Sequence, residues 1–283
     1  MSITWQEYLK EDALEIYDVE IPLNNNNVGE CVFKGDEHFG NPVYDETKTP
    51  MKIVKAQRDY VEKNEHLRIV SMGDELELIS KRPQKHIRNS GREMLMAEEA
   101  DTYCGVWGES FYKMIGKVTG NHELRLTREI DRFGLTGFPI IDSEIEKANP
   151  DCVISDPERG ILLRIKAGDE TYMGYFSHGT GSSTSPDYYV KRVFNVFEGI
   201  DFCAMGHIHQ TFSHNYPILD LGTRYKNPRR KSRIGIRTGT TTPYLAYAEN
   251  KLYPIAEPSN VIVSFDGTKK KMNVDRLMQD RIL

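Results

Sequence analysis

Residues 67–77 read LRIVSMGDELE, an apolar run that stops at Gly73 and gives way to acidic side chains. A short apolar run bounded by glycine is typical of a buried strand that ends in a loop. The same arrangement recurs along the chain, and polar side chains of metal-ligand type follow each run. The other runs are residues 28–33, 114–118, 172–176 and 200–205. We therefore expect five buried strands whose carboxyl ends carry functional side chains.

The segments between these runs include stretches with the spacing of helices, at residues 50–64, 92–103 and 186–197. Strand and helix alternate early in the chain, which is typical of an α/β core. The later part changes character, because strand candidates follow one another closely at residues 153, 161–165, 172–176, 234–238 and 261–265. That half is expected to supply antiparallel strands, which can form a second sheet.

The chain has 283 residues, of which 39% are hydrophobic, and it can bury a core of one domain. Glycine and proline are distributed and do not mark a linker. We expect a single domain over residues 1–283, with a motif-bearing core at about 28–265 and extensions at both ends. The charged stretch 269–283 is expected to be a terminal helix or a frayed end, and Thr238 to Thr242 a turn, although they could approach a site.

The formal charge of -5 and the pI near 6.0 give no general attraction to nucleic acid or anionic membranes. Binding to a polyanion then requires a local basic patch. The cysteines form no CxxC pair and are expected to be reduced, mostly buried thiols: Cys31, Cys104, Cys152 and Cys203. The start of the chain is unlike a signal peptide, and no apolar run approaches the roughly 18 residues that span a membrane. These features predict a cytoplasmic protein with no membrane partner, and they leave its oligomeric state open.

Seven side chains that follow the five runs are of metal-ligand type: Asp36, His38, Asp74, Asn121, His178, His207 and His209. In an open α/β sheet, sites form beyond the carboxyl ends of strands, so these side chains converge if the strands share a sheet. Mixed Asp, His and Asn ligation suits borderline or hard divalent metals. Seven ligands are too many for one ordinary site, but they fit two metals that share one carboxylate.

Each motif taken alone has another explanation. A DxH pair is more often surface or core, and residues 120–123 (GNHE) can be a turn before a helix. Residues 206–209 (GHIH) are a stronger signal, because imidazoles at i and i+2 leave a strand end on one side. The joint occurrence, behind five strand-like runs, predicts a two-metal centre. Two metals about 3.5–4 Å apart can bind phosphoryl oxygens, acidify a bridging water and neutralise developing charge.

These residues resemble the calcineurin-like metallophosphoesterase family. The family motifs DxH, GDxx[DE], GNH[DE], an isolated His and GHxH occur in this order at residues 36–38, 73–77, 120–123, 178 and 206–209. The resemblance spans residues 30–210 by motif, and reaches about 265 if the later strands complete the second sheet. It implies a four-layer αββα sandwich with two mixed sheets.

The resemblance also implies a role for each residue. One metal would be held by Asp36, His38 and His209. The other would be held by Asn121, His178 and His207, and Asp74 would bridge both. His122 would be the catalytic imidazole, oriented by Glu123, and a metal-bound hydroxide would attack the phosphorus. The ions expected are two divalent metals, manganese first, with iron, zinc, nickel or magnesium as alternatives.

One departure from the family concerns the substrate. The Ser/Thr protein phosphatase branch extends the second motif to GDxxDRG and uses that arginine on phosphate. Here Leu78 and Ile79 follow Glu77, which argues against that branch, although Arg82 or a remote arginine could substitute.

Two basic stretches, residues 81–92 and 224–237, lie within this mildly acidic chain. Such stretches are either solvated surface loops or contacts for a phosphate backbone. On the second interpretation, substrate is bound by Arg82, Arg88, Arg224, Arg229 and Arg230. The leading hypothesis is a phosphodiesterase acting on nucleic acid or a nucleotide. The alternative is a phosphomonoesterase for a small metabolite or phosphoprotein, and the intact ligand set with His122 argues against a non-catalytic scaffold.

Overall fold

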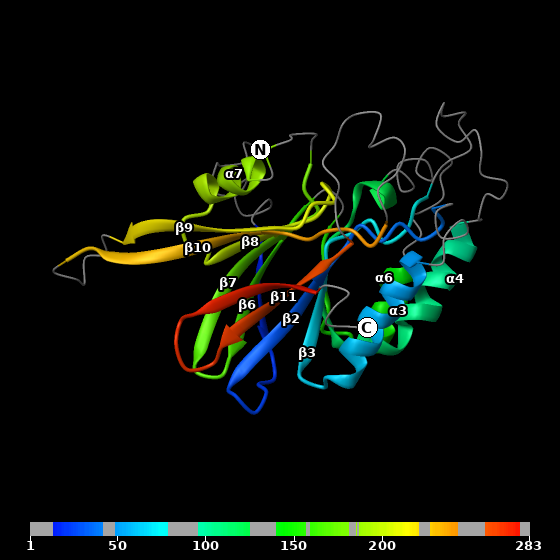
Figure 1. Cartoon of the computed structure of the whole chain (residues 1–283), viewed down its shortest axis with the longest axis horizontal. Helices are drawn as coiled ribbons and strands as arrows, with labels where there is room; N and C mark the ends of the chain where they lie inside the picture. The colour runs from blue at the N-terminus through cyan, green and yellow to red at the C-terminus, as the bar shows by residue number, and fades with distance from the viewer. Residues whose placement is uncertain are drawn as a thin grey trace, which may run out of the picture.

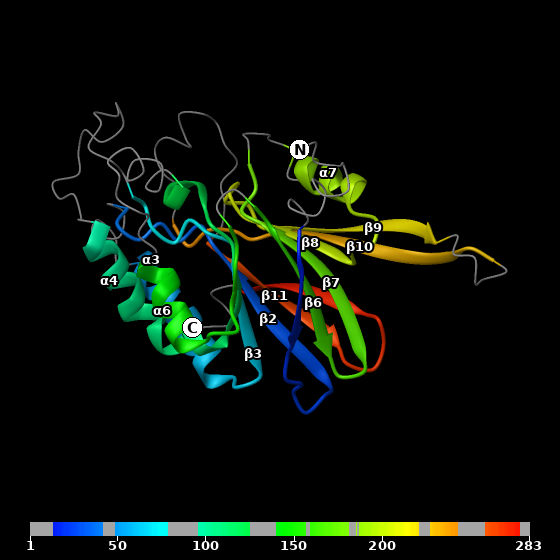
Figure 2. The ribbon, with the colours of Figure 1, turned by 180° about the vertical axis from the view of Figure 1, so that it is seen from behind.

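The computed structural model describes residues 14–41, 49–78, 96–124, 140–156, 159–180, 185, 187–220, 227–242 and 258–277. Over these ranges the chain forms two facing β-sheets with helices on both outer faces (Figures 1 and 2). This arrangement confirms the expected αββα sandwich with two mixed sheets. Among the described helices, none combines the length and the apolar character that crossing a lipid bilayer requires.

Sheet A contains, in spatial order, β1 (Ile16–Glu20), β6 (Ile161–Ala167), β7 (Glu170–Ser177), β8 (Phe202–Met205), β10 (Arg229–Arg237) and β9 (Phe212–Asp220). Strands β7, β8 and β10 are parallel, and β9 returns antiparallel to β10. The outer face of this sheet is covered by α7 (Tyr188–Val196), whose Val190 and Phe194 pack on Cys203 and Met205. The β9–β10 hairpin extends away from the rest of the sandwich (Figure 1).

Sheet B contains, in spatial order, β12 (Met272–Leu277), β11 (Asn260–Asp266), β2 (Val28–Lys34), β3 (Leu67–Ser71), β4 (Met114–Lys117) and β5 (Val153–Ile154). Strands β2 to β5 are parallel and almost wholly buried, which explains why their sequences read as continuous apolar runs. Their outer face packs on α3 (Thr49–Lys63), α4 (Met96–Trp107), the 3-10 helix η1 (Gly108–Lys113) and α6 (Ile140–Ala148).

The core between the sheets is built around aromatic side chains. The ring centroids of Phe33 and Phe176 are 5.1 Å apart, and those of Phe176 and Phe202 are 5.4 Å apart, both edge to face. Such pairs add to the free energy gained by burying the rings, about 0.5–1.5 kcal/mol each. This core holds the two sheets face to face, so the ends of their strands are also held together.

The later strands differ from the expectation in where they pair. Residues 153 and 261–265 belong to sheet B, because β5 pairs with β4 and β11 pairs antiparallel with β2. The expectation of a helix or frayed end is wrong for residues 272–277, which form β12 on β11. Burial alternates along β12, so its charged residues can lie on the solvent-exposed face of an edge strand. The four cysteines are free, with Cys31 and Cys203 buried, and the single-domain assignment stays a prediction.

Candidate metal centre

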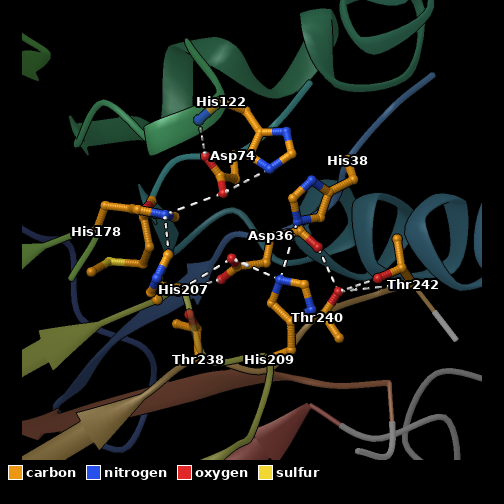
Figure 3. A network of polar contacts seen from close by, with 12 residues as sticks. Asp36, His38, Asp74, His122, His178, His207, His209, Thr238, Thr240 and Thr242 are labelled. Atoms are coloured by element: carbon orange, nitrogen blue, oxygen red, sulfur yellow. Dashed lines mark hydrogen bonds and ion pairs between the residues drawn. The ribbon is translucent and has the colours of Figure 1, made fainter. Parts of the chain in front are cut away.

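The seven predicted ligands come from loops at one edge of the sandwich. Asp36 and His38 follow β2, Asp74 follows β3, and Asn121 follows β4 in sheet B. From sheet A, His178 follows β7, and the other two imidazoles, His207 and His209, follow β8. The carboxyl ends of the parallel strands in both sheets therefore meet, and the side chains point toward one another (Figure 3).

The first metal group consists of Asp36, His38 and His209, whose ligand atoms all lie within 4.8 Å of one another. The Nε2 atom of His209 is 3.3 Å from Asp36 Oδ1 and 3.2 Å from His38 Nε2. Asp36 is fully buried and His38 is 5% exposed. A buried carboxylate beside two imidazoles is a donor set that fits a divalent transition metal.

The second metal group consists of Asp74, His178 and His207, again with ligand atoms within 4.8 Å of one another. The Nε2 atom of His178 is 3.2 Å from Asp74 Oδ2, 3.2 Å from His207 Nδ1 and 3.0 Å from Asn121 Oδ1. His178 Nδ1 lies 2.7 Å from the carbonyl oxygen of Met72, which fixes the orientation of the ring. This donor set also fits a divalent ion, and Asn121 lies beside it, while its role as a ligand stays a prediction.

Within the second metal group, the Asp74 carboxylate lies between His178 and His122. Its Oδ1 accepts a hydrogen bond from the backbone N–H of His122 at 2.9 Å. Burial raises the pKa of the Asp74 carboxyl, but contact with His178 and the nearby His38 and His122 outweigh burial and hold the pKa below its usual range. Asp74 is therefore an ionised carboxylate that can bind a cation, while its bridging role stays a prediction.

The loops that carry the ligands have a strained backbone conformation. Five ligand residues that are not glycine have left-handed φ values, namely Asp36 (53°), His38 (50°), Asp74 (53°), His207 (73°) and His209 (57°). Each such residue costs on the order of 1–3 kcal/mol, and it persists only where its surroundings hold it. Here the loops brace one another, because the N–H of Asp36 donates to the carbonyl of Gly73 and the N–H of His38 donates to the carbonyl of Asp74.

His122 is oriented by a backbone carbonyl. Its Nδ1 lies 2.5 Å from the carbonyl oxygen of Glu77, so Nδ1 carries the hydrogen and Nε2 faces the site, 4.0 Å from Asp74 Oδ2. Burial and the charge of nearby His38 lower the pKa of His122. The ring is thus held with Nδ1 at the Glu77 carbonyl and Nε2 directed to the ligand carboxylate of Asp74.

Glu123 contacts the loop that carries Asp74, and its expected role in orienting His122 stays a prediction. Its carboxylate accepts hydrogen bonds from the backbone N–H groups of Asp74 at 3.1 Å and Leu76 at 3.2 Å. It therefore supports the strained Asp74 loop, while the Glu77 carbonyl contacts Nδ1 of His122. Gly120 makes this possible, because a Cβ there would collide with the backbone nitrogen of Asp74.

Sequence reasoning assigned no role to Glu77 or to the threonines after β10. Glu77 Oε2 is 3.2 Å from His38 Nδ1, and it is the last residue of the GDxx[DE] motif, so a signal was present. Thr240 Oγ1 is 2.6 Å from the carbonyl oxygen of Asp36. The expectation of a simple turn for Thr238 to Thr242 is therefore incomplete, because β10 ends at the same edge as the ligand loops.

Two of the five predicted substrate-binding arginines fall within the described residues, and these two lie away from the metal groups. Arg82, Arg88 and Arg224 lie outside the described residues. Arg229 and Arg230 are exposed at the start of β10, while Arg237 ends this strand at the ligand edge. At about 3.4 Å per residue, the eight steps from Arg229 to Arg237 span about 27 Å. Contact between Arg229 or Arg230 and a phosphate at the metal groups would therefore require a long substrate.

Comparisons with known proteins give structural likeness at low identity. No protein-family model and no curated protein matches the chain. A predicted phosphoesterase from Streptococcus pneumoniae is similar at 14% identity and TM-score 0.37, over 88% of this chain and 90% of that one. The calcineurin-like phosphoesterase YfkN from Bacillus subtilis is similar at 12% identity and TM-score 0.41, over 89% and 92%. The Entamoeba histolytica Vps29 complexed with zinc is similar at 10% identity and TM-score 0.35, over 88% of this chain and 98% of that one. Such low values leave the activity to be inferred from the site itself.

Proposed function

We propose that the chain is a metal-dependent phosphodiesterase that hydrolyses nucleic acid or nucleotides. The observation that supports this proposal is the meeting of two buried carboxylate–imidazole groups at one edge of the sandwich, beside His122. Asp36, His38 and His209 would hold one divalent ion. The other would be held by Asn121, His178 and His207, with Asp74 shared between the two.

The chain's own residues would orient the substrate and move protons. Divalent ions bound in the two groups would supply positive charge for phosphoryl oxygens and lower the pKa of coordinated water. His122 Nε2, with Nδ1 held by the Glu77 carbonyl, faces the place where the leaving oxygen would lie. In its imidazolium form, with a hydrogen on each nitrogen, a ring so placed can give the Nε2 hydrogen to the leaving oxygen and become neutral, which is general acid catalysis.

The first prediction concerns the metal requirement. Chelation followed by desalting is expected to abolish hydrolysis of bis-p-nitrophenyl phosphate, because the ligand groups alone supply no Lewis acid. Titration with Mn²⁺ should restore the rate as about two ions bind per chain, and parallel titrations with Fe²⁺, Zn²⁺, Ni²⁺ and Mg²⁺ identify the preferred ion.

The same assay separates diester from monoester hydrolysis. We expect the bis ester to be turned over faster than p-nitrophenyl phosphate. The reverse ratio would favour the phosphomonoesterase, and inertness toward both esters with every metal bound would contradict phosphoester hydrolysis.

The proposal of a polymeric substrate is supported by the outer half of the β9–β10 hairpin. This basic arm, residues 217–220 and 229–233, has four cations, Arg229, Arg230, Lys231 and Arg233, and one acidic residue, Asp220. Lys231 is paired with Asp220 at 2.6 Å, which leaves an excess of positive charge on a chain of net charge -5. A phosphate backbone is attracted to such a local excess whatever its sequence.

The second prediction follows from the distance between the basic arm and the metal groups. The double variant Arg229→Glu with Arg230→Glu should weaken hydrolysis of long duplexes but leave bis-p-nitrophenyl phosphate unaffected. Because duplex DNA rises about 3.4 Å per base pair, the effect should appear only above about 8 base pairs. The slope of log K against log salt should also fall by about 1.8, if each arginine neutralises one phosphate.

A matched control is the charge reversal of Lys52 and Lys55, two exposed lysines on α3, in the outer helix layer. This control should leave the length dependence unchanged. Equal effects of the two double variants, or an arm effect on the small ester, would contradict the role of the basic arm.

A further inference from the structure

The segment Thr238–Thr242 crosses from sheet A to sheet B beside the first metal group (Figure 3). At its start, the N–H of Thr238 donates to the carbonyl of Met205, the last residue of β8, at 2.9 Å. Two residues later, Thr240 Oγ1 lies 2.6 Å from the carbonyl oxygen of Asp36, which follows β2. The segment therefore joins the two sheets at the point where their ligand loops meet.

The direction of the Thr240 hydrogen bond follows from its partners. A carbonyl oxygen only accepts, so the Thr240 hydroxyl must donate to Asp36. The same hydroxyl oxygen accepts from the backbone N–H of Thr242 at 3.0 Å, and the Thr242 hydroxyl is 2.7 Å away. Both threonines are 2% exposed. Because both groups of Thr242 donate to the Thr240 hydroxyl oxygen, the hydroxyl hydrogen of Thr240 points to the Asp36 carbonyl.

Asp36 is held from sheet A at both ends. Its carbonyl receives the Thr240 hydroxyl, and its carboxylate receives the backbone N–H of His207 at 2.9 Å and 3.2 Å. Its φ of 53° is a conformation that a non-glycine residue keeps only when its contacts hold it. Without the Thr240 hydroxyl, a buried carbonyl would lose its donor, and the backbone would be released two residues before His38.

The segment cannot easily shift to restore the lost contact. The N–H of Ser259 donates to the carbonyl of Thr240 at 3.0 Å, which fixes the segment on the side of sheet B. Gly239 lies so close to Ser259 that a Cβ would collide with the Ser259 carbonyl oxygen and approach Thr211 Oγ1 within 2.6 Å. The segment is thus held by backbone contacts on the side of sheet B.

We propose that Thr240 is a positioning residue, which sets the separation between the sheet B ligands Asp36 and His38 and the sheet A ligand His209. The inference rests on the proposed function in one respect, that the first metal group binds a divalent ion. Partners of this kind behind metal ligands typically contribute about 10- to 100-fold to metal affinity. The contribution of Thr240 should be confined to the first metal group, because its hydroxyl bonds to Asp36.

The test is a calorimetric Mn²⁺ titration of the metal-free full chain. Thr240→Val keeps the shape and removes the hydroxyl, and it should weaken one of the two binding events by about 10- to 100-fold. The weakened event should be the one that disappears in His209→Ala. Thr240→Ser should restore wild-type affinity, which a purely volume-dependent role would not predict.

Thr238→Val is the matched control, since it makes the same change in the same buried segment. The Thr238 hydroxyl is 3.5 Å from the Met205 carbonyl oxygen, a weak contact, and this carbonyl already accepts a hydrogen bond from the Thr238 N–H. The Mn²⁺ affinity of Thr238→Val should therefore stay near the wild-type value. If Thr240→Val does not fold, Thr242→Val should give a smaller loss at the same site. Equal affinity in wild type and Thr240→Val, or equal loss at both sites, would overturn the role of Thr240.

The outcomes also separate this inference from the proposed function. Wild-type protein that binds Mn²⁺ but hydrolyses no phosphate ester would sink the function and leave the role of Thr240 intact. Protein that hydrolyses esters with unchanged Mn²⁺ affinity in Thr240→Val would do the reverse. Absence of binding by the wild-type chain of Mn²⁺, Fe²⁺, Zn²⁺, Ni²⁺ and Mg²⁺ alike would overturn both.

Discussion

Replacing Asp74 with asparagine is expected to lower both metal content and hydrolytic rate more than any substitution outside the ligand set. The Asp74 carboxylate lies 3.2 Å from His178 Nε2, and its neighbours hold its pKa below the usual range, so it supplies a full negative charge. Asparagine has the same shape and can still accept the backbone N–H of His122, which should preserve the fold. The lost charge should cost several kcal/mol of transition-state stabilisation, a rate decrease of about 10³-fold or more.

A metal titration of Asp74→Asn tests whether the two metal ions share this residue as a ligand. If Asp74 bridges, both Mn²⁺ binding events should weaken together. Loss at the second metal group alone would assign Asp74 to that group and contradict bridging. Asp59→Asn, on the exposed side of α3 beside Arg58, is a control for the same chemical change. Full metal content with a full rate in Asp74→Asn would sink the proposed centre.

Replacing His122 with alanine is expected to slow hydrolysis while both metal groups still bind. His122 contacts the centre through its backbone N–H and faces it with Nε2. Its ring is in neither the first nor the second metal group, but it forms a third group of possible ligand atoms with His38 and Glu77, all within 4.8 Å of one another. General acid catalysis contributes about 10²–10⁴-fold where the leaving oxygen needs a proton. The loss should therefore be of this size for a diester with an alkyl leaving group, and much smaller for p-nitrophenol, which leaves as a stable anion.

The contrast between the two leaving groups decides what His122 does. Equal losses would assign the ring to stabilising the phosphoryl group, and no loss with either ester would contradict a catalytic role. His66→Ala serves as the control, because His66 is paired with Glu30 at 2.7 Å near the amino ends of β2 and β3. Metal content should stay at the wild-type value in both variants.

The ligand set was predictable because its signals are local. The ligand loops after β3, β4 and β8 follow strands buried on both faces, and such a strand reads as an apolar run that ends at a small residue. The strand before His178, β7, alternates between buried and more exposed residues but ends in the same way. Asp36, Asp74 and His178 could therefore be placed at strand ends before any pairing was known. The parallel arrangement of those strands then brings their carboxyl ends to one edge.

The contacts that support the ligands were not predictable in the same way. Glu123 bonds to backbone N–H groups 47 and 49 residues away, and Thr240 bonds to a carbonyl 204 residues away. Neither partner is marked by its residue type, since a backbone group is present at every position. Similarly, the basic run 229–233 contains phosphate-binding residue types, but only the course of β10 places it far from the metal groups.

The sequence by itself determined the chemistry of the centre, because carboxylates and imidazoles must stand in the chain before any fold can gather them. It also determined the strands, through apolar runs whose length and termination need no tertiary context. Only the tertiary structure decided which carbonyl orients His122, which hydroxyl supports Asp36 and how far Arg229 lies from the site. These depend on how two sheets pack against each other, and packing is a property of side-chain volumes distributed over the whole core.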